Sequence, residues 1–354
     1  MPKKSVKKTT KKTAKKKAAK KSFRRDPVVL AFDESNDFTI SVVGKDGDVV
    51  PGRMTIEKMM RQFGKKLQVL ANKHGSLDGF KGNELAAILN GMPMLEADSP
   101  AEQAQEIMFQ AFESRSSKKR IELAKKALEI NPDCVDALIL LAEETGKTRR
   151  SLIEQYRKAV AAAERSLGAK FIKKNTGHFW MIHETRPYMR ALEGLAANLR
   201  GDGELLESLA TYKKMLILNP GDNQGVRYQA LYLLIEVDQD DSAEELYESY
   251  SDDASAWWRF GRALLDFRKL GDTPKTRAIL QDAIKYNPFV PQYLLEIKCR
   301  PSTPPGYYGI GDENEAMYYY DAAIRAWAHT DDVYDWLLDV SQEFFTVENK
   351  KLKR

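Results

Sequence analysis

The segments KKALEINP (125–132), KKMLILNP (213–220) and QDAIKYNP (281–288) each look like the end of an amphipathic helix that stops at an Asn-Pro step. Proline cannot continue a helix because it lacks an N–H donor, and the residue before it avoids the α region. The second and third prolines are 68 residues apart, which is twice the tetratricopeptide period of about 34. This spacing predicts an all-α, tetratricopeptide-like helical-repeat solenoid.

Between the Asn-Pro steps, apolar residues recur at helical spacing. We expect helix pairs at 101–132, 133–167, 189–220, 223–254 and 257–288. The distance from the first to the second Asn-Pro step exceeds two periods by about twenty residues, which we assign to an inserted loop at 168–184. The repeats should therefore occupy 99–300. A break rich in Pro and Gly (301–311) follows, and 301–354 should also contain C-terminal capping helices.

The first 25 residues contain thirteen Lys or Arg and no acidic residue, and we expect them to form a disordered tail. Of the 56 basic and 51 acidic residues of the chain, 43 basic and 51 acidic remain beyond this tail, so the body has a charge of −8. Counterion release favours nonspecific binding of such a tail to nucleic-acid phosphates. The alternative is a solvated tail that folds loosely over the acidic body. The lysines expected to bind are Lys7, Lys8, Lys11, Lys12, Lys15, Lys16 and Lys17.

Residues 26–98 are predicted to be a small mixed α/β element or a linker. The β-branched segment FTISVV (38–43) predicts a strand, and the following KDGD predicts a turn with a short return strand at 49–50. Apolar spacing predicts helices at 55–70 and 83–89.

Several functional classes find little support in the sequence. The two cysteines, Cys134 and Cys299, form no CxxC pair, and a reducing cytoplasm is expected. No run of 18 apolar residues occurs, so we expect no membrane span. The N-terminus also lacks the apolar segment of a secretory signal.

The segment 168–184 contains two histidines, His178 and His183, on either side of Trp180. A zinc site would need further ligands, and HETRP is not the HExxH pattern. We therefore favour a packing role for these residues over metal binding. GYYGIG (306–311) lacks the Gly-Lys-Ser/Thr end of a phosphate loop, and no nucleophile elbow occurs. We expect no catalytic activity, no cofactor and no metal.

A family resemblance is carried by three segments: HFWMIHETRPYMRALEGLA (178–196), LNPGDNQGVRY (218–228) and YNPFVPQYLLEIK (286–298). From about Ser99 to its end, the chain resembles tetratricopeptide-repeat proteins related to the suppression-of-tumorigenicity seven family. The resemblance implies a helical-repeat fold without a known reaction. Eukaryotic members of that family are membrane-associated, whereas no span is predicted in this chain.

The resemblance also implies which positions of each repeat face the groove of the stack. In this chain these positions are Arg190, Arg227, Tyr228, Trp258 and Arg262. Arginine binds carboxylates through two parallel hydrogen bonds, and aromatic side chains add anchoring area. We therefore expect the groove to bind an acidic peptide segment or a C-terminal carboxylate. The alternative is that the arginines pair internally with Glu184, Glu193, Glu236 or Asp266.

These observations predict a non-catalytic scaffold or adaptor for protein–protein interaction in the cytoplasm. The alternative is a nucleic-acid-associated protein tethered by its Lys-rich tail. The oligomeric state is not specified by the sequence.

Overall fold

The computed structural model describes residues 28–32, 38–44, 47–48, 53–76, 80–303 and 305–351 of the 354-residue chain. The chain divides into two compact units, Met1–Leu95 and Glu96–Arg354. The lysine-rich segment 1–25, with the seven lysines expected to bind nucleic acid, lies outside the described residues.

The first unit contains a three-stranded antiparallel sheet with the order β1-β2-β3, formed by Val28–Phe32, Phe38–Gly44 and Gly47–Asp48. A strand is thus present where FTISVV predicts one. The return strand was predicted two residues too late, because Gly47 already pairs with Gly44 in a tight hairpin. Two helices follow, α1 (Arg53–His74) and α2 (Gly82–Gly91), around the positions that the apolar spacing predicts.

A buried lysine joins the two helices of the first unit. Lys66 on α1 donates hydrogen bonds from Nζ to the carbonyls of Leu89 (2.9 Å) and Met92 (2.8 Å) at the end of α2. These bonds satisfy carbonyls at a helix end that has no further partners within its own helix. Gln62 likewise exchanges two hydrogen bonds of 3.0 Å with the backbone of Leu95. Burial lowers the pKa of Lys66.

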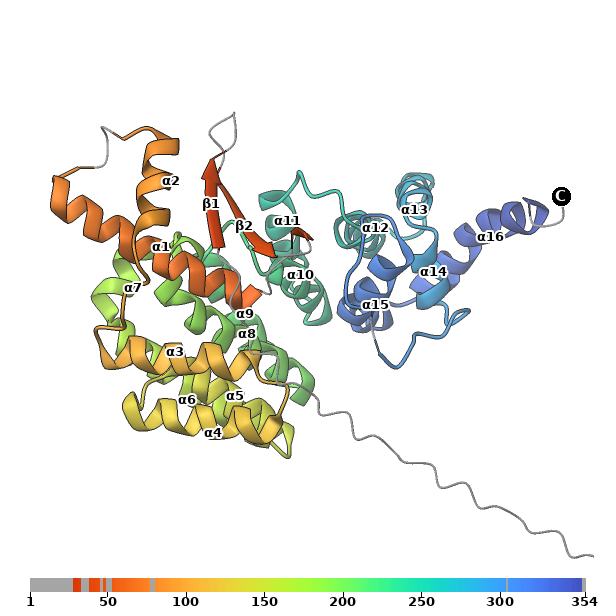
Figure 1. Ribbon diagram of the computed structural model, residues 1–354. Coiled ribbons are helices and arrows are strands. Elements are labelled where there is room, and N and C mark those ends of the chain that lie inside the picture. Colours follow the sequence, from red (N-terminus) through yellow and green to blue (C-terminus); the bar gives the residue numbers. More distant parts are fainter. Residues whose placement is uncertain are drawn as a thin grey trace, which may run out of the picture. The chain divides into compact units, whose positions relative to one another are not determined.

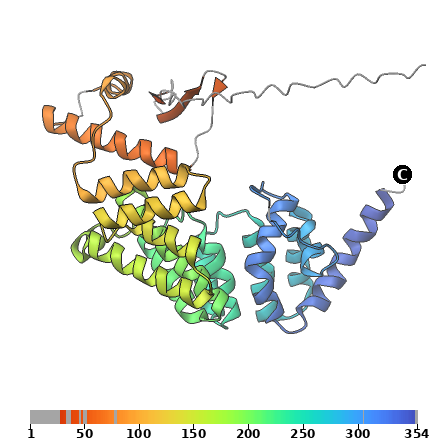
Figure 2. The same cartoon turned by 60° about the horizontal axis from the view of Figure 1, so that its bottom comes forward.

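Within its described residues, the second unit is all-helical (Figure 1). From α3 to α13, neighbouring helices contact one another in chain order, with α6 meeting α8 across the short α7 (Figure 2). This arrangement confirms the predicted helical-repeat fold. The helices are α3 (Pro100–Glu113), α4 (Ser117–Ile130), α5 (Val135–Thr145), α6 (Arg149–Leu167), α7 (Ala169–Asn175), α8 (Arg186–Asp202), α9 (Leu205–Leu218), α10 (Val226–Glu236), α11 (Asp240–Ser249), α12 (Ala256–Leu270), α13 (Pro274–Tyr286), α14 (Phe289–Leu294), α15 (Glu313–Ala328) and α16 (Val333–Lys351).

The three Asn-Pro steps end helices, as predicted. Helices α4, α9 and α13 stop one residue before Asn131, Asn219 and Asn287, and each asparagine is the C-cap. The side-chain Oδ1 of Asn131 accepts a hydrogen bond of 3.1 Å from the N–H of Asp133, and Asn287 makes the same bond with Phe289. Asparagine therefore shapes the turn that follows, while proline prevents the helix from continuing.

The segment 168–184, predicted as an inserted loop, is largely helical. It contains α7 and the 3-10 turn Phe179–Met181, and a second 3-10 turn, His183–Thr185, leads into α8. Phe179 anchors the segment because its side chain is fully buried, with its ring 6.1 Å from that of Tyr188. The hydroxyl of Thr185 donates to the carbonyls of Phe179 and Ile182, which closes the two turns on each other. The predicted insertion is therefore folded into the stack.

The C-terminal helices, predicted as an end cap, pack further inside the unit. Helix α15 lies along α10, α12 and α14, while α16 contacts α13 and α14 (Figure 1). Tyr319 on α15 is fully buried, with ring centroids 5.5 Å from Tyr232 and 5.4 Å from Phe260. Trp327 is also fully buried and donates from Nε1 to the Tyr319 hydroxyl at 2.6 Å. These large, buried aromatic side chains make α15 part of the core of the unit. A helix that only capped the end of the stack would not need to bury them.

Candidate functional site

Arg190, the first predicted groove residue, forms an internal ion pair. It lies on the second turn of α8 and donates from Nε (3.0 Å) and Nη2 (2.8 Å) to the two carboxylate oxygens of Asp136 on α5. Asp136 is 1% exposed and also accepts a bond of 2.8 Å from Gln105 on α3. The Asp136 carboxylate therefore links α3, α5 and α8, and the guanidinium neutralises its buried charge.

Arg227, on the first turn of α10, is surrounded by acidic and aromatic groups. It bonds to Asp253 from Nε (2.9 Å) and Nη2 (2.7 Å) and to Asp222 from Nη1 (3.0 Å). Its guanidinium carbon lies 4.4 Å from the ring centroid of Tyr228 and 5.7 Å from that of Trp258. Burial raises the pKa of the Asp253 carboxyl, but hydrogen bonds from Ser255 and Arg227 outweigh burial and leave this pKa below its usual range.

The predicted aromatic groove residues belong to the core and its margin. Trp258 is fully buried and donates from Nε1 to the Tyr247 carbonyl at 3.2 Å. Tyr228 stacks on Trp257 at 4.6 Å and meets Trp258 edge-on. A fully buried tryptophan has no surface left for a partner, so its predicted role in binding is replaced by a packing role.

Arg262 completes the pattern of internal pairing. It bonds to Glu244 on α11 at 2.6 Å and to Asp266 on its own helix at 2.9 Å. The sequence suggested Glu184, Glu193, Glu236 and Asp266 as internal partners. In the bonds described above, only Asp266 pairs with one of the groove arginines, Arg262. Glu236 pairs instead with Arg200 at 3.1 Å. The structure brings Arg227, Tyr228 and Trp258 together, but Arg190 faces α5 and Arg262 faces α11.

The face formed by α10 and α12, here called the first-helix face, is covered by α15. Arg200 donates from Nη2 to the Ala322 carbonyl on α15 at 2.8 Å, and Arg325 donates back to the Arg200 carbonyl at 3.2 Å. With Tyr319 set between Tyr232 and Phe260, α15 fills this face with its own aromatic side chains.

The histidines of the inserted segment are not arranged as a metal centre. His178 is exposed, His183 is half-buried, and Trp180 lies under the guanidinium of Arg186 at 5.0 Å. Arg186 also donates to the Trp180 carbonyl at 3.2 Å. Across the described part of the chain, no group of three or more His, Cys, Asp or Glu residues is placed to hold a metal ion.

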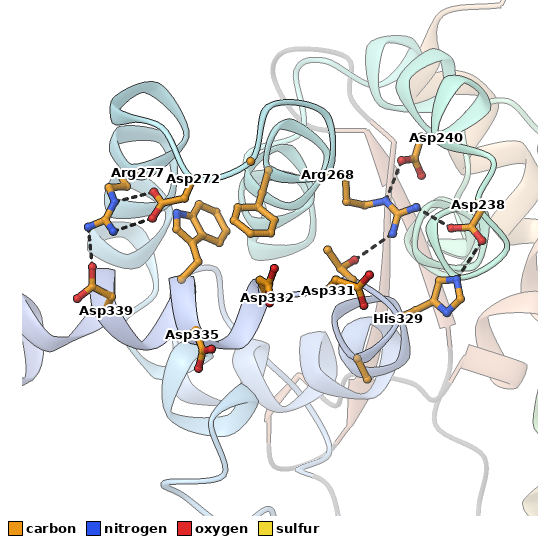
Figure 3. Close-up of a pocket in the computed structure, with 15 residues that line it drawn as sticks. Asp238, Asp240, Arg268, Asp272, Arg277, His329, Asp331, Asp332, Asp335 and Asp339 are labelled. Carbon is orange, nitrogen blue, oxygen red and sulfur yellow. Dashed lines mark hydrogen bonds and ion pairs between the residues drawn. The ribbon is translucent and has the colours of Figure 1, made fainter.

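A second candidate site, the acidic cleft, was not predicted from the sequence. It has a volume of about 940 Å³. It lies between the start of α11, the C-terminal end of α12, the start of α13 and the junction of α15 with α16 (Figure 3). Two aromatic side chains, Phe267 and Trp336, line it and stack at 4.3 Å. The charged and titratable residues that line it are Asp238, Asp240, Asp272, Asp331, Asp332, Asp335, Asp339, Arg268, Arg277 and His329.

Two arginines organise the two ends of the acidic cleft. Arg268 bonds to Asp238 and Asp240, each at 2.8 Å. Arg277 bonds to Asp272 at 2.6 Å and to Asp339 at 2.7 Å. Figure 3 shows Asp331 and Asp332 between these two groups. Seven carboxylates thus face two guanidiniums, and the middle of the cleft is strongly negative.

A sequence signal for the acidic cleft exists, although it is partial. Asp332, Asp335 and Asp339 follow one another at three- and four-residue spacing, which places them on one side of a helix. Arg268, Asp238 and Asp272 come from other helices, and their approach depends on how the helices pack. Only the α16 half of the cleft could therefore be identified without a structure.

Comparison with known proteins supports the family resemblance. Residues 80–185 match the family model described as ST7 protein, a range that runs from α2 to the end of the inserted segment. The Protein ST7 homolog of Caenorhabditis elegans is 26% identical over 279 residues, covering 68% of this chain and 51% of its own. The Protein ST7 homolog of Drosophila melanogaster is 27% identical, with 63% and 45% covered. The Suppressor of tumorigenicity 7 protein-like of Gallus gallus is 25% identical, with 62% and 44% covered.

The chain spans about half the length of the curated relatives it matches. The family match does not name tetratricopeptide repeats. No helix within the described residues has both the length and the apolar character needed to cross a bilayer.

Proposed function

We propose that this chain is a non-catalytic scaffold for protein–protein interaction, related to the ST7 proteins. The observation that carries the proposal is the helical array of the second unit, in which one buried apolar cluster extends from α5 to α16. Stacked helix pairs form long, rigid surfaces with room for a partner, which is the usual role of helical repeats. Cys134 is buried and Cys299 is exposed, and neither forms a disulfide within the described residues, which supports a reducing compartment such as the cytoplasm.

The surface used by the scaffold differs from the one expected from the sequence. Arg190, Arg227 and Arg262 are engaged by internal carboxylates, and α15 covers the first-helix face. An acidic peptide would have to replace those ion pairs, which costs the desolvation of several charged groups. We therefore place partner binding on surfaces that remain open.

The test is capture of the tagged full-length chain from its own cells, followed by titration of each purified co-purifying protein by calorimetry. The proposal predicts saturable, direct binding by at least one of these proteins and no turnover of the partner. A matched variant carries Gln at the seven tail lysines, from Lys7 to Lys17, so that proteins bridged by nucleic acid are removed. If no captured protein binds the purified chain directly, the scaffold function is wrong.

A second candidate function is attachment to nucleic acid through the tail. It is favoured by the thirteen basic residues of 1–25, which are matched by no acidic residue there. Fluorescence anisotropy with mixed-sequence duplex DNA and RNA at several salt concentrations tests it. The wild-type chain should bind more weakly as salt rises, and the seven-lysine variant should show weaker binding and a shallower salt dependence. Absence of salt-sensitive binding by the wild type would exclude this function.

A further inference from the structure

We propose that the acidic cleft is a docking site for a lysine- or arginine-rich segment of a partner protein. The inference rests on the proposed scaffold function and names the surface and the partner chemistry that it uses. The two arginines of the cleft, Arg268 and Arg277, already satisfy two carboxylates each at its ends. The ligand therefore has to match what the middle of the cleft leaves open.

Three carboxylates of the cleft lack internal compensation. Within the described residues, the side chains of Asp331, Asp332 and Asp335 have no ion pair or hydrogen bond, and all three residues are exposed. Like charges at short separation repel one another and attract cations. The described carboxylates are nevertheless not grouped to share one metal ion. A ligand with several separated positive charges suits them better than a single divalent cation.

Trp336, one of the two aromatic residues of the cleft, adds a second, independent requirement for the ligand. Trp336 lines the cleft and is only 3% exposed, and its indole Nε1 has no hydrogen-bond partner among the described residues. A buried N–H donor without an acceptor is unfavourable, so a ligand gains free energy there if it brings an acceptor to this atom, which is closed to solvent in the free chain. Peptide carbonyls are such acceptors. A basic peptide offers both separated cations and carbonyl oxygens, whereas a free cation offers only charge.

The three aspartates also have a structural alternative. They lie at or before the first turn of α16, where acidic residues stabilise the positive end of a helix dipole. That role predicts a loss of stability on substitution but no change in peptide affinity. It also leaves the unpaired indole of Trp336 unexplained. The two roles are separable by experiment.

The test is titration of the full-length chain with an end-blocked peptide of six arginines separated by glycines, with a glutamate peptide of the same length as a control. The test variant is Asp331→Asn, Asp332→Asn, Asp335→Asn. Asparagine suits Asp332, whose φ of 57° lies in the left-handed region. The matched control, Glu154→Gln, Asp202→Asn, Glu204→Gln, removes the same charge from three exposed acids elsewhere in the second unit.

We expect the wild type and the control variant to bind the arginine peptide within about threefold of each other, and the cleft variant to bind at least about tenfold more weakly. Trp336→Phe, which keeps the ring and removes the N–H, should weaken binding severalfold without changing its salt dependence. Equal weakening by both triple variants, or no binding by the wild type, would overturn the proposal. If the triple variant fails to fold, Asp331→Asn and Trp336→Phe provide the same comparison singly.

The outcome is distinguishable from failure of the scaffold function. A captured protein that binds the wild type and the cleft variant equally would remove the cleft as the docking site but leave the scaffold intact. A chain that binds the arginine peptide at the cleft but captures no protein would contradict the scaffold alone.

Discussion

At the scale of single residues, internal ion pairs explain why the arginines on successive helices are not free to bind ligands. Asp136 illustrates the principle, because it is almost completely buried and its charge is met by both arms of Arg190. A buried carboxylate without a cation is strongly unfavourable. The partners of these arginines come mainly from neighbouring helices and loops, so the sequence spacing within one repeat could not identify them.

Arg190→Ala should lower the free energy of unfolding by about 3–5 kcal/mol, because it leaves Asp136 buried and unpaired. The control is Arg157→Ala, which breaks an exposed pair with Glu207 and should cost about 0–1 kcal/mol. Urea unfolding followed by circular dichroism measures both variants. Equal costs would mean that the Asp136 charge is not desolvated as the structure indicates.

The pH dependence of stability should report on Asp253. Its folded pKa is lowered, so its contribution is present above the unfolded carboxyl pKa of about 3.9 and is lost as pH falls through the folded pKa. The pKa of Asp222 shifts in the opposite direction. Burial raises it, and this increase exceeds the decrease caused by the hydrogen bonds that Asp222 accepts. Asp253→Asn should cost about 1–3 kcal/mol at pH 7 and less at pH 3, as measured by urea unfolding. A cost that is the same at both pH values would contradict the assignment.

At the scale of helices, local signals and long-range packing differ in what the sequence reveals. The ends of α4, α9 and α13 were predictable because proline and asparagine act on their immediate neighbours. The inserted segment was misjudged because its order depends on burial of Phe179 beside α8, which no local pattern announces. The position of α15 along α10 and α12 is also an outcome of packing that no local pattern announces.

Tyr319→Ala tests whether α15 is part of the core. The side chain is fully buried beside Tyr232 and Phe260, so its removal should cost about 3–5 kcal/mol. Leu338→Ala on α16 is the control, because that side chain is 42% exposed and should cost well under half as much. Urea unfolding monitored by tryptophan fluorescence compares the two variants. A similar, small loss in both would show that α15 is only loosely attached.

At the scale of the whole molecule, charge and packing assign different tasks to different parts of the chain. The first 25 residues have a charge of +13, and the remaining residues have a charge of −8. The charge balance was predictable from composition, and the helical-repeat body was predictable from the spacing of the Asn-Pro steps and of the apolar residues. The location of the open acidic surface was not, because the acidic cleft is assembled from residues up to about one hundred positions apart, from Asp238 to Asp339.

The central claim is that the helical body is an interaction platform whose first-helix face is filled by α15. Hydrogen–deuterium exchange of the full-length chain, with and without a purified captured partner, tests it most directly. We predict new protection at 268–277 and 328–339, around the acidic cleft, with unchanged protection along α15. Loss of protection in α15 together with new protection in α10 and α12 would show that a partner displaces this helix, and would contradict the account.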